Sequence, residues 1–463
     1  MLPAVAIVGR PNVGKSTLFN RLTATRDALV ADFPGLTRDR RYGVGRAAER
    51  RFIVIDTGGL TALNSDAITA LVAAQVDIAI EEADAVVLVV DHKSGLTAED
   101  TRIAERLRRE SKPVVIAVNK AEGVAGEMAE AEFHRMGLGA PVRIAALHGQ
   151  GVDELLAAAL ASFPSDDSDI HETEQGPNVA VIGRPNVGKS TLINRLLGEN
   201  RLITSPEPGT TRDSIHVPCE RDGQKFVLVD TAGIRRRPRV TETVEKFSVV
   251  QSLKAIEDAG AIIALLDARD SVTDQDLHLI GLAAARGRAL AIGINKWDGL
   301  DGHERRLIER EVARRLDFVP YASLHYVSAL HGSGIAELIK AALVAHKNAG
   351  VELPTPRLNR VLEDALQVNP PPLVRGRQVR LRYAHQGGRY PPIIVVHGNQ
   401  AQRLPDHYKR YLENSFREAL KLHGTPVRVE LRTGDNPFGG RRNKLTPRQG
   451  KSRKRMLRFK HKK

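Results

Sequence analysis

The sequence predicts an α/β protein with two doubly wound domains of mostly parallel strands, followed by an α+β domain and a basic tail. Three observations predict this fold class. Residues 4–20 read AVAIVGRPNVGKSTLFN and residues 178–194 read NVAVIGRPNVGKSTLIN, which is an internal repeat. In both copies, short apolar runs alternate with helical patterns, as in βα units around a parallel sheet. The last quarter of the chain carries a large excess of basic side chains.

The repeat fixes the elements that we expect in each doubly wound domain. The second copy follows the order of the first, because Asp56 and Asp230 keep the spacing of the repeat and Asn119 and Asn295 depart from it only slightly. In the first copy we expect strands at residues 4–8, 52–56, 85–91 and 114–119, and helices at residues 15–22, 65–81, 98–109 and 152–161.

Domain boundaries follow from the same pattern. We place the first domain at residues 1–164 and the second at residues 176–350. The acidic segment 165–175, SDDSDIHETEQ, is interpreted as a flexible linker. Ligands are expected at the carboxyl ends of the parallel strands.

A glycine-rich loop joins the first strand to the first helix in each copy, and it predicts phosphate binding. Glycines let the backbone wrap so that its N–H groups face an anion at the helix N-terminus. Lys15 and Lys189 would reach the terminal phosphates, and Ser16 and Ser190 would supply an oxygen to Mg²⁺. The two loops are Gly9-Arg10-Pro11-Asn12-Val13-Gly14-Lys15-Ser16 and Gly183-Arg184-Pro185-Asn186-Val187-Gly188-Lys189-Ser190.

A second pair of motifs predicts a nucleotide-dependent switch. The segments Asp56-Thr57-Gly58-Gly59 and Asp230-Thr231-Ala232-Gly233 each follow a strand. Their aspartates would hold Mg²⁺ through water, and Gly59 and Gly233 would offer an N–H to the terminal phosphate. The hydroxyls of Thr37 and Thr211 would complete the Mg²⁺ shell only while a triphosphate is bound, so that these loops order and release.

The base-recognition motif differs between the copies. In the second copy, Asn295-Lys296-Trp297-Asp298 closes a strand, and Ser328-Ala329 completes the pocket. The Asp298 carboxylate would accept from the guanine N1–H and amine, Asn295 would reach the other base edge and the Lys296 stem would cover the ring, which selects GTP over ATP. The first copy has Asn119-Lys120-Ala121-Glu122, and Ala145-Ala146 stands in place of Ser-Ala. We therefore predict weaker or less selective guanine binding by the first domain.

The motifs GRPNVGKS, PGxTRD, DTxG and NKxx in two tandem copies, followed by a short basic domain, resemble the Der (EngA) family of bacterial double GTPases over the whole chain. This resemblance implies GTP hydrolysis and a role in assembling the large ribosomal subunit, with rRNA contact. Leu60 and Ile234 follow the DTxG motifs where Ras-like proteins carry a water-orienting glutamine, so intrinsic turnover should be slow. Asn12 and Asn186 are similar to the asparagine that binds K⁺ in potassium-activated GTPases; simple bracing of the loop is an equal alternative.

Residues 351–440 predict a third domain. We expect a helix at residues 359–367, strands at 378–383 and 393–397, a helix at 406–422 and a strand at 427–433. This α-β-β-α-β order resembles a KH domain, but the segment lacks the GxxG loop with which KH modules clamp nucleic acid. Docking against the other domains and RNA contact therefore both stay open.

Charge is concentrated at the C-terminus. The 463 residues carry a net charge of +14, but residues 1–351 sum to −4, residues 352–440 to +6 and residues 441–463 to +12 without any acidic residue. We expect 441–463 to be a disordered polycationic arm for an RNA partner, and the segment RRRPR at 235–239 lies where a switch would move. An aromatic content of 4% argues against a reader built mainly from base-stacking platforms.

The cellular setting follows from what the sequence contains. The single cysteine, Cys219, and a start without a leader pattern favour the reducing cytoplasm. We expect no stable membrane association and a monomer away from the ribosome. The alternative is a membrane-associated regulatory GTPase that uses the basic tail on anionic lipid.

Overall fold

The computed structural model describes most of both repeat copies and the third domain. The described residues are 2–23, 30–32, 41–47, 50–57, 76–122, 130–163, 176–199, 216–221, 223–229, 249–374 and 376–433. Thr37, Thr211, residues 58–60 and 230–239, the proposed linker and the tail lie outside them. The chain forms two compact units, one of residues 1–352, 388–392 and 417–428, the other of the remaining C-terminal residues.

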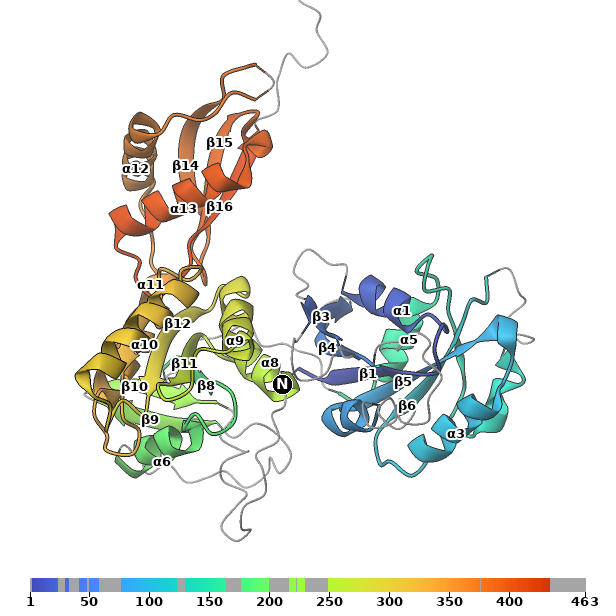
Figure 1. Ribbon diagram of the computed structural model, residues 1–463. Coiled ribbons are helices and arrows are strands. Elements are labelled where there is room, and N and C mark those ends of the chain that lie inside the picture. Colours follow the sequence, from blue (N-terminus) through green and yellow to red (C-terminus); the bar gives the residue numbers. More distant parts are fainter. Residues whose placement is uncertain are drawn as a thin grey trace, which may run out of the picture. The chain divides into compact units, whose positions relative to one another are not determined.

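The first repeat copy forms a seven-stranded sheet in the order β2-β3-β4-β1-β5-β6-β7 (Figure 1). The pairs β1–β4, β1–β5, β5–β6 and β6–β7 are parallel, which confirms the predicted doubly wound fold. The short antiparallel strands β2 and β3 were not expected. The strands are β1 Ala4–Val8, β2 Val30–Asp32, β3 Arg41–Ala47, β4 Arg50–Asp56, β5 Ala85–Asp91, β6 Val114–Asn119 and β7 Val142–Arg143, and the helices include α1 Lys15–Leu22, α3 Ala98–Leu107 and α5 Val152–Ala159.

The helix predicted at residues 65–81 is only partly described. Residues 76–82 are helical, and the earlier part lies outside the described residues.

The second copy repeats this architecture with six strands in the order β13-β12-β11-β8-β10-β9. Its central strand β11 is buried along its whole length, as its apolar run predicts. Helix α10 was not expected, because Val312 is its one fully buried residue and most of the others are charged. The strands are β8 Asn178–Ile182, β9 Val217–Arg221, β10 Gln224–Leu228, β11 Ala261–Asp267, β12 Ala289–Asn295 and β13 Ser323–Tyr326, and the helices include α6 Lys189–Glu199, α8 Val249–Asp258, α9 Asp274–Ala285, α10 Gly302–Arg315 and α11 Ile335–Ala349.

The third domain has the expected α-β-β-α-β order and a sheet in the order β14-β15-β16 (Figure 1). The hydroxyls of Tyr408 and Tyr411 donate to backbone oxygens of Asn369 and Ala365, each at 2.7 Å, so the second helix packs against the first. The two largest differences from the predicted boundaries are that the first helix begins four residues earlier, with Pro356 in its first turn, and that β14 continues through two glycines. The elements are α12 Thr355–Val368, β14 Arg380–Gly388, β15 Ile393–Asn399, α13 Asp406–Leu420 and β16 Arg428–Thr433.

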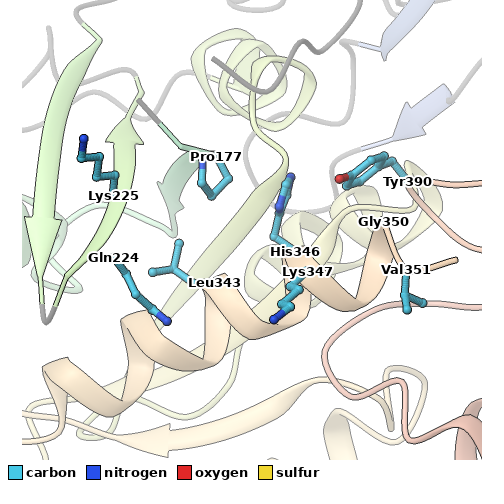
Figure 2. Close-up of a pocket in the computed structure, with 9 residues that line it drawn as sticks. All are labelled: Pro177, Gln224, Lys225, Leu343, His346, Lys347, Gly350, Val351 and Tyr390. Atoms are coloured by element: carbon cyan, nitrogen blue, oxygen red, sulfur yellow. The ribbon is translucent and has the colours of Figure 1, made fainter. Parts of the chain in front are cut away.

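The loop 388–392 packs against the end of α11 within the first unit. The backbone N–H of Tyr390 donates to the carbonyl of Ala349 at 3.0 Å, and its ring centroid lies 5.1 Å from that of His346. Gly350 leaves no room for a side chain, since a Cβ there would lie 2.2 Å from the Tyr390 hydroxyl. Figure 2 shows the cavity of about 520 Å³ that His346, Gly350 and Tyr390 line together with Lys225 and others. Among the helices that the structure describes, none is long and apolar enough to cross a membrane.

Candidate nucleotide-binding sites

In both glycine-rich loops, the tight turn begins and ends at a glycine. The backbone φ and the close neighbours at these positions exclude a residue with a side chain. Gly9 has φ +148°, and a Cβ there would lie 2.3 Å from the carbonyl oxygen of Val89. Gly14 has φ +102°, and its Cβ would lie 2.2 Å from the side-chain nitrogen of Asn119. The corresponding glycines of the second loop, 183 and 188, repeat this geometry with approaches of 2.5 and 2.2 Å. Each loop therefore wraps tightly at the carboxyl end of a central strand, as a phosphate cradle requires.

The loop lysines point into these cradles. Lys15 Nζ donates to the carbonyl oxygens of Gly9 and Arg10, both at 2.9 Å, and Lys189 Nζ donates to that of Arg184 at 2.7 Å. Burial lowers the pKa of Lys15, and nearby carboxylates, that of Asp56 first, oppose this shift. The ammonium groups thus lie at the centre of the loop, where they can exchange carbonyl oxygens for phosphate oxygens.

Asn119 and Asn295 connect the loops to the base-recognition segments. Asn119 Nδ2 donates to the carbonyl of Val13 at 2.8 Å, and its Oδ1 accepts from the N–H of Ala146 at 3.0 Å. Asn295 makes the matching bonds to Val187 at 2.7 Å and from Ala329 at 2.8 Å. Both asparagines are buried. Each one therefore fixes the distance between the phosphate end and the base end of its site, in addition to the base contact expected from the sequence.

The next residues, Lys120 and Lys296, are held by aspartates that the sequence analysis missed. Lys120 Nζ donates to Asp91 Oδ2 at 2.7 Å and to the carbonyl of Asn12 at 2.8 Å, and Lys296 Nζ contacts Asp267 in the same way as Lys120 contacts Asp91. Burial alone would raise the pKa of Asp91, but the hydrogen bonds from Lys120 and its neighbours outweigh this and lower the pKa. Asp91 and Asp267 end corresponding strands and are separated by the same interval as the two asparagines, which is the signal that could have found them.

The loop arginines turn away from the cradle. Arg10 Nε donates to Asp100 at 3.3 Å, and Arg184 Nε donates to Asp276 at 3.0 Å. Each aspartate also closes a capping box with a threonine at the start of a helix, in α3 or in α9. Both aspartates have fully buried side chains. The side chains of Arg10 and Arg184 thus anchor the phosphate loop to α3 or α9, and the nucleotide contact that the sequence assigned to these residues stays a prediction.

A further pair of arginines holds the base loop. Arg195, from α6, donates to the carbonyl oxygens of Leu330 at 2.7 Å and His331 at 3.2 Å. Arg21, from α1, binds two carbonyl oxygens of the corresponding loop in the first copy, at positions 146 and 147. These arginines occupy equivalent positions of the internal repeat, so they too could have been found by following it.

The two base sites differ in how their carboxylate is supported. A hydrogen bond from the Ser328 side chain is the main reason why the pKa of Asp298 lies below its ordinary value. In the first copy the residue in the place of Ser328 is Ala145, which has no hydroxyl, and Glu122 instead contacts Lys93 at 3.4 Å. Asp298 also has a basic neighbour, Arg269 at 3.9 Å, so the support that distinguishes the second copy is the Ser328 hydroxyl.

The remaining predicted residues divide between described and undescribed parts. Asp56 ends β4 and pairs in register with Ile7, just before the glycine-rich loop, and Thr57 Oγ1 donates to the Ile7 carbonyl at 3.0 Å. Ser16 lies at the start of α1, and Ser190 at the start of α6. Trp297 packs against Tyr326, with ring centroids 4.2 Å apart, and Ala121 is buried. The predicted residues that lie outside the described ranges are Thr37, Gly58, Gly59, Leu60, Thr211, Asp230, Thr231, Ala232, Gly233 and Ile234.

Two copies of a doubly wound sheet, each with a phosphate cradle at one strand end and a guanine-type motif at another, define a tandem P-loop GTPase. The family model described as "50S ribosome-binding GTPase" matches residues 4–120 and 178–296. The one described as "KH-domain-like of EngA bacterial GTPase enzymes, C-terminal" matches residues 352–432. The chain belongs to the Der family of GTPases, which are GTP-hydrolysing, ribosome-associated proteins that bind GTP and GDP, typically with Mg²⁺.

Full-length relatives carry this assignment. The "GTPase Der" of Thioalkalivibrio sulfidiphilus is 53% identical over 465 residues, which cover 100% of both chains. That of Hahella chejuensis is 51% identical over 457 residues, covering 99% of this chain and 97% of the relative. Among solved structures, the G domain of the T. maritima FeoB iron transporter is similar at 29% identity and a TM-score of 0.28, covering 35% of this chain and 98% of that one. The assignment rests on the sequence matches and not on this structural likeness.

Proposed function

We propose that the protein is a GTP-dependent switch in the assembly of the large ribosomal subunit, acting in the cytoplasm on rRNA. The observation that carries this proposal is the pairing of two nucleotide cradles with a basic C-terminal region. Residues 352–440 and 441–463 carry net charges of +6 and +12, against −4 for the preceding residues. Such a surplus favours a polyanionic partner, and the description of the matching family model points to the 50S particle.

The roles that we propose for the site residues are those that the sequence motifs predict, and the cradle geometry supports them for the loop lysines. Lys15 and Lys189 would bind the terminal phosphates from their present positions over the loop carbonyls. The residues that would hold Mg²⁺ or the terminal phosphate are, in each copy, a serine, an aspartate that acts through water, a threonine that joins only with a triphosphate, and a glycine N–H: Ser16, Asp56, Thr37 and Gly59, and Ser190, Asp230, Thr211 and Gly233. This arrangement couples the two switch loops to the state of the nucleotide.

The switch is tested by sedimenting the full chain with ribosomal particles in a non-hydrolysable GTP analogue and in GDP. We expect association with the large subunit or its precursors in the analogue and release in GDP. Equal association in both nucleotides, or none in either, would remove the switch from the proposal. A chain lacking residues 441–463 should bind the particles more weakly and hydrolyse GTP at nearly the wild-type rate; a parallel loss of hydrolysis would contradict this division of labour.

Asn12 and Asn186 suggest a second metal requirement. Both are solvent-exposed residues at the rim of the loop, with φ of 65° and 63°. We propose that their side-chain oxygens ligate K⁺, whose charge would offset the charge that develops on the phosphates during hydrolysis. Turnover should then be faster in KCl than in NaCl at equal ionic strength. Identical rates in the two salts would assign these residues to bracing the loop alone.

A further inference from the structure

Three aromatic rings gather on two neighbouring strands of the third domain. Tyr383 and His385 lie on β14, and His397 lies on β15. The ring centroids of His385 and His397 are 5.2 Å apart at an interplanar angle of 20°, and those of Tyr383 and His385 are 5.6 Å apart at 27°. The third pair, Tyr383 and His397, is separated by 5.9 Å. The rings therefore form one continuous group, which we call the ring cluster.

The members of the ring cluster differ in their exposure, and the two histidines are half-buried. Tyr383 is 45% exposed, although large aromatic side chains are usually well buried. An exposed tyrosine beside two further rings offers an aromatic face to another planar group.

A positive charge lies close to the rings. Arg432 is exposed on β16, where its guanidinium lies 2.9 Å from the Glu430 carboxylate and its charge acts on His385. Burial is the first cause that lowers the pKa of His385, followed by the charges of His397 and Arg432. A lowered pKa keeps this imidazole neutral at physiological pH, and a neutral ring stacks on an aromatic base without adding a charge of its own.

We propose that the ring cluster stacks against unpaired bases of RNA while the neighbouring Arg432 binds an adjacent phosphate. This inference rests on the proposed function, because it names the surface by which the third domain would contact rRNA. The domain lacks the GxxG loop, so RNA binding by this domain requires a different surface. The low aromatic content excluded a protein built mainly of stacking platforms, but two of these three rings are histidines, which that count leaves out.

Photocrosslinking tests the contact directly. The full chain, loaded with a non-hydrolysable GTP analogue, is irradiated with a short unstructured RNA that contains 5-iodouridine, and the crosslinked peptides are identified by mass spectrometry. We expect crosslinks at Tyr383, His385 or His397. Crosslinks confined to the basic tail would overturn this inference and leave RNA binding by the protein intact. A wild-type chain that binds no RNA would overturn the RNA partner itself, and the inference with it.

Variants measure the contribution of the ring. Tyr383→Leu keeps an apolar side chain but removes the stacking face, and we expect it to weaken binding of the same RNA by roughly five- to hundredfold, the effect of losing one stacked base. Tyr383→Phe keeps the ring and should bind like the wild type. Unchanged affinity in Tyr383→Leu, or equal losses in the leucine and phenylalanine variants, would contradict stacking. Retained GTPase rates in both variants exclude a general folding defect.

A matched pair of charge variants separates the surface from the overall charge. Arg432→Gln removes a charge next to the ring cluster, and Arg360→Gln removes one from the exposed side of α12. We expect the first to weaken RNA binding and to reduce its dependence on salt, since one phosphate contact is lost. The second should leave both nearly unchanged. Equal effects of the two substitutions would show that only the net charge matters, which would contradict the proposed surface.

Discussion

The ion pair between Arg184 and Asp276 gives a quantitative test of how the second phosphate loop is held. The Asp276 carboxylate accepts three hydrogen bonds, from the Thr273 N–H at 3.0 Å, the Thr273 hydroxyl at 2.8 Å and Arg184 Nε at 3.0 Å. Its side chain is fully buried, and that of Arg184 is 17% exposed. The substitution Asp276→Ala removes the reciprocal cap, worth about 1 kcal/mol, and a charge-assisted bond worth about 1.5–3 kcal/mol. We therefore expect a local destabilisation of about 2.5–4 kcal/mol.

Hydrogen exchange resolved to peptides is the suitable assay, because global unfolding of a multidomain chain is not a single two-state transition. Loss of protection should centre on the start of α9 and on residues 183–190. The first copy serves as an internal control, since its own pair, Arg10 and Asp100, is untouched. Nucleotide affinity of the second domain should fall together with the protection.

A double-mutant cycle isolates the pair. Arg184→Met keeps the apolar stem and removes the charge, so the single variants and the double variant together give the coupling free energy between the two side chains. We expect a coupling of about 1.5–3 kcal/mol. A value below about 0.5 kcal/mol would refute the reasoning, because the two residues would then act independently and the bond would not hold the loop.

Three further predictions concern the base site, the phosphate loop and the cysteine. Gly188→Ala should abolish nucleotide binding in the second domain, since φ is +98° and the new Cβ would lie 2.2 Å from the Asn295 nitrogen; calorimetry should then give one nucleotide per chain, and an unchanged stoichiometry of two would contradict it. In that background, Glu122→Asp with Ala145→Ser should raise the GDP affinity of the first domain by roughly tenfold in a fluorescence titration, and no gain would remove the proposed asymmetry. Burial raises the pKa of Cys219 to about 11 from 9.0, so the folded thiol should resist alkylation at neutral pH and react after unfolding; rapid native labelling would be inconsistent with its position. The pKa of the Cys219 thiol is higher in the folded chain than in the unfolded one, so burial of the neutral thiol contributes fully to the free energy of unfolding below pH 9.0. This contribution is lost as the pH rises toward 11. Unfolding of the wild type and of Cys219→Ala, measured as a function of pH, would show the loss.

The parts of the fold that the sequence predicts are those with a strong local signal. Uniformly apolar runs such as residues 85–90 and 261–266 predict central parallel strands, and the structure buries both completely. Strand β3, RYGVGRA, contains two glycines and two arginines, so its pattern does not indicate a strand, and only its antiparallel pairing with its neighbours makes it one. Helix α10 was not predicted for a similar reason, because most of its side chains are charged or exposed and leave no clear apolar pattern.

The site shows the same limit more sharply. The phosphate loops are continuous in sequence, so their spacing alone predicts their chemistry. Asp91, Asp100 and Arg21 act on residues at least 29 positions away, through contacts that exist only after the sheet has formed. No local pattern marks these long-range contacts, although Asp100 also belongs to a local capping box. Such residues can be found because the second copy carries the same residue type at the equivalent position of the repeat. A side chain that supports the site in one copy is needed at the same place in the other.

This duplication locates the difference between the two domains. The ties of lysine to aspartate, asparagine to loop, and arginine to capping aspartate recur in both copies with closely similar geometry. The copies diverge at the base loop, where Ser328 supports Asp298, whereas Ala145 offers no hydroxyl to Glu122. The serine hydroxyl acts by orienting the carboxylate, so the two differences between the base loops affect the same group. In the first copy the carboxylate of Glu122 is longer by one methylene, and Ala145 has no hydroxyl to orient it. Within the described residues, the domains thus share one way of holding phosphate and differ in how they hold the base, so any division of labour between them should first be sought in guanine affinity and selectivity.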